Sequence, residues 1–143
     1  MRVALIGSAD FGKAALEAFL DRGDEIVAVF CPPDNPKSSK PEVLKEAALA
    51  RGLTPLQFAS LKSPEAAQAL IDSHADICVM AYVLQFVPQE LCKIPKHGTI
   101  QYHPSLLPKY RGPSSINWPI IRGDTKTGLT IFRPNEGLDE GPV

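Results

Sequence analysis

Arg2-Val3-Ala4-Leu5-Ile6-Gly7 opens the chain as a short apolar run that ends in a turn glycine. Residues 11–22 follow it with apolar side chains at helical spacing, and Gly23 is a typical residue just past a helix end. A second apolar run, residues 26–31, comes next. A buried strand, a helix and another buried strand form a βαβ unit, so the start of the chain predicts a parallel sheet.

The rest of the chain continues this alternation. Ser63-Pro64-Glu65 is a helix start, with a capping hydroxyl, a proline in the first turn and a carboxylate near the positive end of the helix dipole. The apolar strands lack polar alternation, which indicates helices on both faces of the sheet. The predicted fold class is α/β with a doubly wound, mostly parallel sheet. We expect further helices at 41–51, 63–73, after Pro88 and at 114–122, and strands at 53–58, 75–82, 98–102 and 128–132.

The composition is that of one globular domain. Of 143 residues, 44% are hydrophobic and 22% charged, and the net charge of -1 predicts no broad electrostatic surface for nucleic acid or for a membrane. The cysteines are odd in number and lack zinc spacing, so we expect reduced thiols and a cytoplasmic protein without a metal. Nothing near Val143 reads as a capped domain end, so we expect residues 1–143 to be one domain of a longer, C-terminally truncated chain.

The segment Gly7-Ser8-Ala9-Asp10-Phe11-Gly12 admits two interpretations. In a parallel α/β fold, amides at the start of this helix could bind a phosphate. The segment lacks the glycine spacing of a dinucleotide site, and Asp10 would repel a phosphate. The alternative is a tight turn between strand and helix. A dinucleotide-dependent dehydrogenase is correspondingly disfavoured.

Two polar segments follow predicted strands and are candidates for the site. His103 stands at the end of the strand 98–102, and Asp139 lies between Gly137 and Gly141 after the strand 128–132. Ligands of open parallel sheets bind beyond the carboxyl ends of strands, and a histidine there can serve as acid or base. Each residue also has a structural interpretation: His103 as a packed histidine bonded to backbone, and Asp139 as a solvated turn residue. The functional interpretation requires the two side chains to converge.

Residues 103–108, His-Pro-Ser-Leu-Leu-Pro, and residues 137–141, Gly-Leu-Asp-Glu-Gly, resemble the two motifs of the 10-formyltetrahydrofolate-dependent formyltransferase family. The resemblance covers the whole chain, and the local sequence is most similar to the hydrolase domain of 10-formyltetrahydrofolate dehydrogenase. It implies a Rossmann-like formyltransferase fold, with residues 1–143 as the N-terminal catalytic domain. It also implies 10-formyltetrahydrofolate as the formyl-donating cosubstrate, bound at the carboxyl edge of the sheet.

The resemblance also implies roles for individual residues. His103 and Asp139 are the implied catalytic pair, and Gln101 would donate its side-chain N–H to the oxyanion. Most transferases of the family have asparagine at the position of Gln101, so this amide is displaced by one methylene. The implied folate-binding residues are Gln85, Phe86 and Val87 through their backbone, together with Ser105, Leu106, Leu107, Pro108, Asn135, Glu136, Gly137 and Leu138.

The implied activity is transfer of a formyl group to an acceptor amine, as in methionyl-tRNA formyltransferases. The alternative is hydrolysis of the same donor to tetrahydrofolate and formate. The local sequence resemblance and Gln101 favour this alternative. A module that binds folate without turnover is a further alternative. The sequence does not identify the acceptor amine, and it predicts a nucleic-acid partner only if that acceptor is a charged tRNA.

Overall fold

The computed structural model describes all 143 residues and divides into two compact units. The first unit comprises Met1–Thr99 and the second Ile100–Val143. No helix is both long enough and apolar enough to span a membrane.

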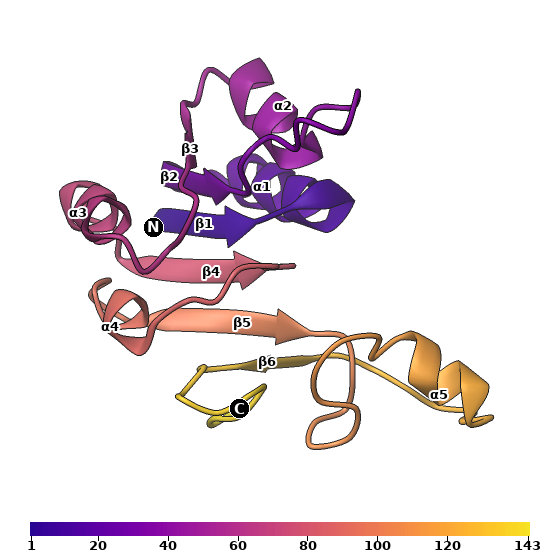
Figure 1. The fold of residues 1–143 in the computed structure, drawn as a ribbon. Coiled ribbons are helices and arrows are strands. Elements are labelled where there is room, and N and C mark those ends of the chain that lie inside the picture. The colour runs from indigo at the N-terminus through magenta and orange to yellow at the C-terminus, as the bar shows by residue number, and fades with distance from the viewer. The chain divides into compact units, whose positions relative to one another are not determined.

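The first unit is a parallel sheet connected by helices. Its strands lie in the order β3-β2-β1-β4, and every neighbouring pair is parallel. Figure 1 shows β1, β2 and β4 side by side with their arrows in the same direction. The strands are β1 (Arg2–Gly7), β2 (Glu25–Cys31), β3 (Pro55–Gln57) and β4 (Ile77–Ala81), and the helices are α1 (Ala9–Asp21), α2 (Val43–Ala50), α3 (Pro64–Asp72) and α4 (Gln89–Cys92).

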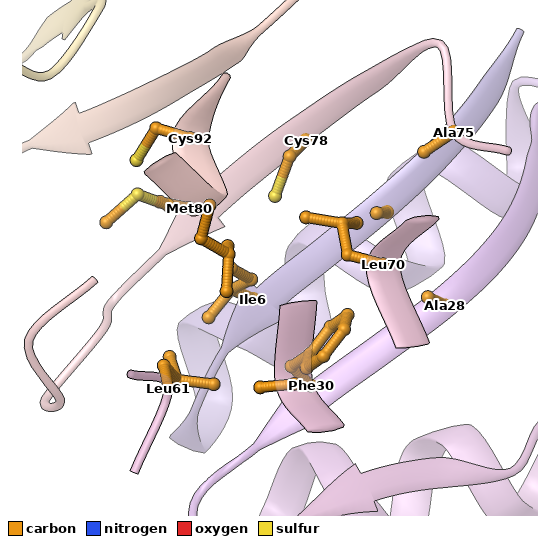
Figure 2. Packing of buried hydrophobic residues seen from close by; sticks show 12 residues of the cluster. Ile6, Ala28, Phe30, Leu61, Leu70, Ala75, Cys78, Met80 and Cys92 are labelled. Atoms are coloured by element: carbon orange, nitrogen blue, oxygen red, sulfur yellow. The ribbon is translucent and has the colours of Figure 1, made fainter. Parts of the chain in front are cut away.

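Both faces of this sheet are covered by helices, which confirms the doubly wound α/β fold. Successive side chains of a strand point to opposite faces, and β1 divides its residues accordingly. Ile6 packs in a cluster with Leu70 of α3, as Figure 2 shows. Leu5 packs in a second cluster with Leu16 of α1 and Leu44 of α2. A strand buried on both faces must be apolar throughout, which explains the uninterrupted hydrophobic runs.

The turn between β1 and α1 is built for close packing. A Cβ on Gly7 would lie 2.6 Å from the backbone oxygen of Ala81, and one on Gly12 would lie 3.3 Å from the backbone of Gly7. The amide of Ala9, at the start of α1, donates to the carboxylate of Glu42 at 2.5 Å. Because a carboxylate of the chain already occupies this helix end, the structure supports the tight-turn interpretation over a phosphate site.

The three cysteines are buried and unpaired. Burial raises the pKa of Cys31 and of Cys78 to about 12. A thiol with such a pKa stays protonated near neutral pH and is a poor nucleophile. The cysteines therefore behave as core residues.

The second unit contains an antiparallel pair of strands and a short helix. These elements are β5 (Thr99–His103), α5 (Asn117–Ile121) and β6 (Thr130–Phe132). The register pairs Gln101 with Phe132 and His103 with Thr130. The carboxyl end of β6 therefore does not share an edge with the carboxyl end of β5. Asp139 follows β6, as expected, but the loop after β6 has to turn back to bring it to the end of β5.

Candidate active site

His103 ends β5 with its ring almost completely buried, at 5% exposure. Its Nε2 lies 2.7 Å from the backbone oxygen of Tyr110. Its Nδ1 lies 3.4 Å from Oδ2 of Asp139, an ion-pair distance longer than a good hydrogen bond. The expected convergence of the imidazole and the carboxylate is therefore confirmed. Since both ring nitrogens face oxygen atoms, both can donate only when the ring carries two protons, so the geometry suits an imidazolium.

The carboxylate of Asp139 is held by two donors besides His103. The Gln101 side-chain amide donates to Oδ1 at 3.2 Å, and the backbone N–H of Gly112 donates to Oδ2 at 2.7 Å. A carboxylate accepts hydrogen bonds with both oxygens and donates none when ionised, so this environment suits the charged form. The Gln101 amide therefore contacts the carboxylate, whereas the family resemblance implies that it donates to the oxyanion.

Asp139 reaches this position through a tightly closed loop. Its own φ is 47°, a left-handed conformation that aspartate tolerates better than most residues. The loop is closed where the N–H of Arg133 donates to the backbone oxygen of Pro142 at 2.9 Å. Gly141 has a φ of 121°, and a Cβ there would lie 1.9 Å from the backbone oxygen of Arg133. Only glycine fits at this position.

We therefore expect Gly141→Ala to lower the stability and the activity together. The left-handed conformation alone costs about 1–3 kcal/mol for an alanine, and the backbone clash adds to that cost. Urea unfolding and kcat of the full-length protein measure both effects. Gly23→Ala is the matched control, since Gly23 has a φ of 87° with no atom within 4 Å of a built Cβ. Equal losses of stability in the two variants would contradict the steric explanation.

The loop after His103 is fixed by two buried hydroxyl groups. Ser105 is fully buried, and its Oγ donates to the backbone oxygen of Lys109 at 2.6 Å. Thr130 Oγ1 donates to the backbone oxygen of Ser105 at 2.7 Å and accepts from the N–H of Leu107 at 3.1 Å. The peptide bond between Leu107 and Pro108 is cis. Of the predicted folate-binding residues here, Ser105 is thus a structural support, and the exposed Leu106 is free to meet a ligand.

The predicted folate-binding residues 135–138 lie on the surface of the second unit. All four are exposed, and the N–H of Gly137 donates to Oδ1 of Asn135 at 2.9 Å. This side-chain turn shapes the loop directly before Asp139. The exposed residues are Asn135, Glu136, Gly137 and Leu138.

The remaining predicted folate-binding residues belong to the first unit. The Gln85 side chain donates to the backbone oxygen of Phe58 at 2.9 Å, and Val87 packs against the core. Phe86 is 66% exposed and lines a pocket of about 640 Å³. The ammonium of Lys62 lies 4.7 Å from the centre of the Phe86 ring. The Gln85 side-chain N–H group is thus engaged within the unit, and backbone contact of this segment with the pterin stays a prediction.

Sequence reasoning missed three groups that hold the site. They are the backbone oxygen of Tyr110, the backbone N–H of Gly112 and the hydroxyl of Thr130. Backbone atoms carry no residue-type signal, although the left-handed φ of Gly112, 80°, explains why glycine stands there. No group of three or more His, Cys, Asp or Glu side chains could hold a metal ion.

Comparisons with known proteins agree on one family. The family model described as formyl transferase matches residues 1–143. The chain is 39% identical to the methionyl-tRNA formyltransferase of Myxococcus xanthus, covering 99% of this chain and 46% of that protein. It is 40% identical to the mitochondrial 10-formyltetrahydrofolate dehydrogenase of Mus musculus, covering 100% of this chain and 16% of that protein.

Solved structures give the same result. A crystal structure of phosphoribosylglycinamide formyltransferase from Bacillus halodurans matches with a TM-score of 0.78 and 26% identity, covering 99% of this chain and 76% of that chain. A formyltetrahydrofolate deformylase from Pseudomonas syringae shares the fold, with a TM-score of 0.79 and 23% identity over 99% of this chain and 48% of that chain. The chain spans about half the length of the methionyl-tRNA formyltransferases that it matches.

Proposed function

The chain belongs to the formyl transferase family, and we propose that it transfers a formyl group from 10-formyltetrahydrofolate to an acceptor amine. The observation that carries this proposal is the buried pair of His103 and Asp139, whose nitrogen and oxygen lie 3.4 Å apart. We further propose that the activity is of the methionyl-tRNA formyltransferase type, because 39% identity to such an enzyme extends over nearly the whole chain. A charged tRNA would then be the acceptor. These 143 residues would be the N-terminal catalytic domain of the enzyme.

His103 and Asp139 would have separate roles in formyl transfer. The donor supplies the one-carbon unit and leaves as tetrahydrofolate. As the amine attacks, negative charge develops on the formyl oxygen, and a protonated His103 beside it would stabilise that charge. Asp139 would take the proton that the amine loses, directly or through water, and His103 would return a proton to the departing folate nitrogen. The buried surroundings strengthen both electrostatic effects.

The surface around Phe86 fits the chemistry of a folate. The pocket that Phe86 lines is mostly apolar, with walls from Leu61, Pro88 and Leu91. Such walls suit an aromatic ring, and the Lys62 ammonium beside them suits a carboxylate. An aminobenzoyl-glutamate has both groups. The pocket therefore supports the proposal that Phe86 belongs to the folate site, although it does not identify the acceptor.

Hydrolysis of the donor is the second candidate function. The chain is as similar to the 10-formyltetrahydrofolate dehydrogenase as to the methionyl-tRNA enzyme, at 40% and 39% identity. In addition, the Gln101 amide is engaged by Asp139, so the site holds one donor fewer for the developing oxyanion. The nucleophile would then be water, and the product formate.

A product assay separates the two functions. The full-length protein is incubated with 10-formyltetrahydrofolate alone, with methionyl-tRNA, and with a small amine acceptor such as glycinamide ribonucleotide. We expect formylmethionyl-tRNA to form and little formate without an acceptor. Formate at the same rate in all three reactions would establish the hydrolase. Tetrahydrofolate release in none of them, despite saturable binding of a folate analogue, would overturn both candidates.

A further inference from the structure

We propose that Tyr110 and Asp124 are positioning residues, which aim the backbone oxygen of Tyr110 at Nε2 of His103. The inference rests on the proposed function, because it assigns His103 a catalytic role. It concerns a side chain pair on the surface of the second unit that touches no reacting atom.

Several hydrogen bonds hold the turn at residues 109–112. Ser105 Oγ donates to the backbone oxygen of Lys109 at 2.6 Å, and the N–H of Gly112 donates to Asp139 at 2.7 Å. Between them, the hydroxyl of Tyr110 donates to Oδ2 of Asp124 at 2.7 Å. In the same turn, the backbone oxygen of Tyr110 lies 2.7 Å from Nε2 of His103.

The conformation of Tyr110 needs this support. Its φ is 55°, and a bulky residue in the left-handed region is strained unless its surroundings hold it. The ring is held through its hydroxyl and through the guanidinium of Arg122, which lies 5.5 Å from the ring centre. The bond to the carboxylate of Asp124 also raises the pKa of Tyr110, so the phenol keeps the proton that it donates.

Asp124 is placed by the end of α5. Its N–H donates to the backbone oxygen of Pro119 at 2.8 Å, and the N–H of Gly123 donates to Ile120 at 3.0 Å. Gly123 has a φ of 75°, the left-handed glycine that commonly ends a helix. A helix end thus fixes Asp124, Asp124 fixes the Tyr110 ring, and the ring fixes a carbonyl that faces the catalytic histidine.

The carbonyl has a specific consequence for His103. An acceptor at Nε2 requires a proton on that nitrogen, while Nδ1 faces the Asp139 carboxylate, the charged group in contact with the ring. Losing the alignment of the carbonyl would remove one acceptor of the doubly protonated ring. That loss would disfavour the doubly protonated ring relative to the neutral ring. Neither His103 nor Tyr110 is among the predicted folate-binding residues, so donor binding should change little.

Tyr110→Phe and Asp124→Ala test the inference in the full-length enzyme. Each should lower kcat about fivefold to tenfold with the donor KM unchanged within about twofold, since each removes the same hydrogen bond. The alkaline limb of the pH profile of kcat should move to lower pH. The double variant should be no worse than either single variant. Asp124→Asn keeps an acceptor oxygen and should restore most of the activity.

Controls distinguish positioning from a general loss of structure. Asp72→Ala removes an exposed carboxylate that accepts from Gln68 at 2.8 Å on α3, and it should leave kcat and the pH profile unchanged. A further readout is independent of activity: the Nε2 proton of His103 should exchange faster with water in Tyr110→Phe, as measured by nitrogen-15 NMR. Unchanged exchange and an unchanged pH profile, in an enzyme that His103→Ala inactivates, would overturn the inference alone. Full activity of His103→Ala would instead overturn the proposed function.

Discussion

Replacing His103 by alanine is expected to lower kcat about a thousandfold or more while the KM for the formyl donor changes less than about threefold. An oxyanion donor or a general acid each contributes on the order of 10²–10⁴ in rate, and the proposal gives His103 both roles. The ring is buried between Tyr110 and Asp139, so no other side chain replaces it. Steady-state kinetics of the full-length protein, with formate and formylated product measured separately, test the expectation.

His103→Gln distinguishes loss of the transferable proton of His103 from loss of its hydrogen bond to Tyr110. A glutamine amide can reach toward the backbone oxygen of Tyr110, as Nε2 does at 2.7 Å, but it cannot carry or release a proton near neutral pH. We expect His103→Gln to be nearly as inactive as alanine and more stable than it. His97→Ala in the first unit is the control for loss of an imidazole. Activity within about tenfold of the unaltered enzyme in His103→Gln would show that the proton is dispensable.

The fold was largely predictable because it depends on residue type. The strand at 2–7 is confirmed with the predicted bounds, and α3 begins after Ser63, whose Oγ accepts from the N–H of Ala66 at 3.2 Å. Both signals are local, since they require only an apolar run or a capping hydroxyl. The strand expected at 53–58 is β3, which lies at the edge of the sheet and is limited to Pro55–Gln57, because proline lacks the N–H that would extend the ladder.

The site was predictable only in part. Two family motifs indicated His103 and Asp139, but the reasoning about strand ends did not foresee that β6 runs antiparallel to β5. Strand direction depends on how the chain returns over many residues, and no local pattern in 128–132 encodes it. The partner of Gln101 was also missed, because a side-chain amide suits an oxyanion and a carboxylate equally well until the geometry is known.

The second large effect is expected for Asp139→Asn, which should lower kcat about a hundredfold to a thousandfold. The carboxylate accepts from Gln101 at Oδ1 and from Gly112 at Oδ2. An asparagine offers only one oxygen, so its NH₂ group would have to face one of these N–H donors. The substitution therefore removes the charge opposite His103 and also turns an attractive contact into a repulsive one. Kinetics and urea unfolding should show the loss of activity with a loss of stability of about 1–3 kcal/mol.

A double-mutant cycle of Gln101→Ala and Asp139→Ala shows whether the Gln101 amide acts through the Asp139 carboxylate or on the developing oxyanion. If the Gln101 amide acts through the Asp139 carboxylate, its removal should lower kcat in the unaltered enzyme and have little further effect in Asp139→Ala. If it donates to the developing oxyanion, the two losses should multiply. Gln68 and Asp72 on α3 form a similar but exposed amide–carboxylate pair, and the same substitutions there should leave kcat unchanged. Multiplying losses would assign Gln101 to the oxyanion. The half-buried Gln101 amide, which donates to the Asp139 carboxylate at 3.2 Å, would then have to change partners during each turnover.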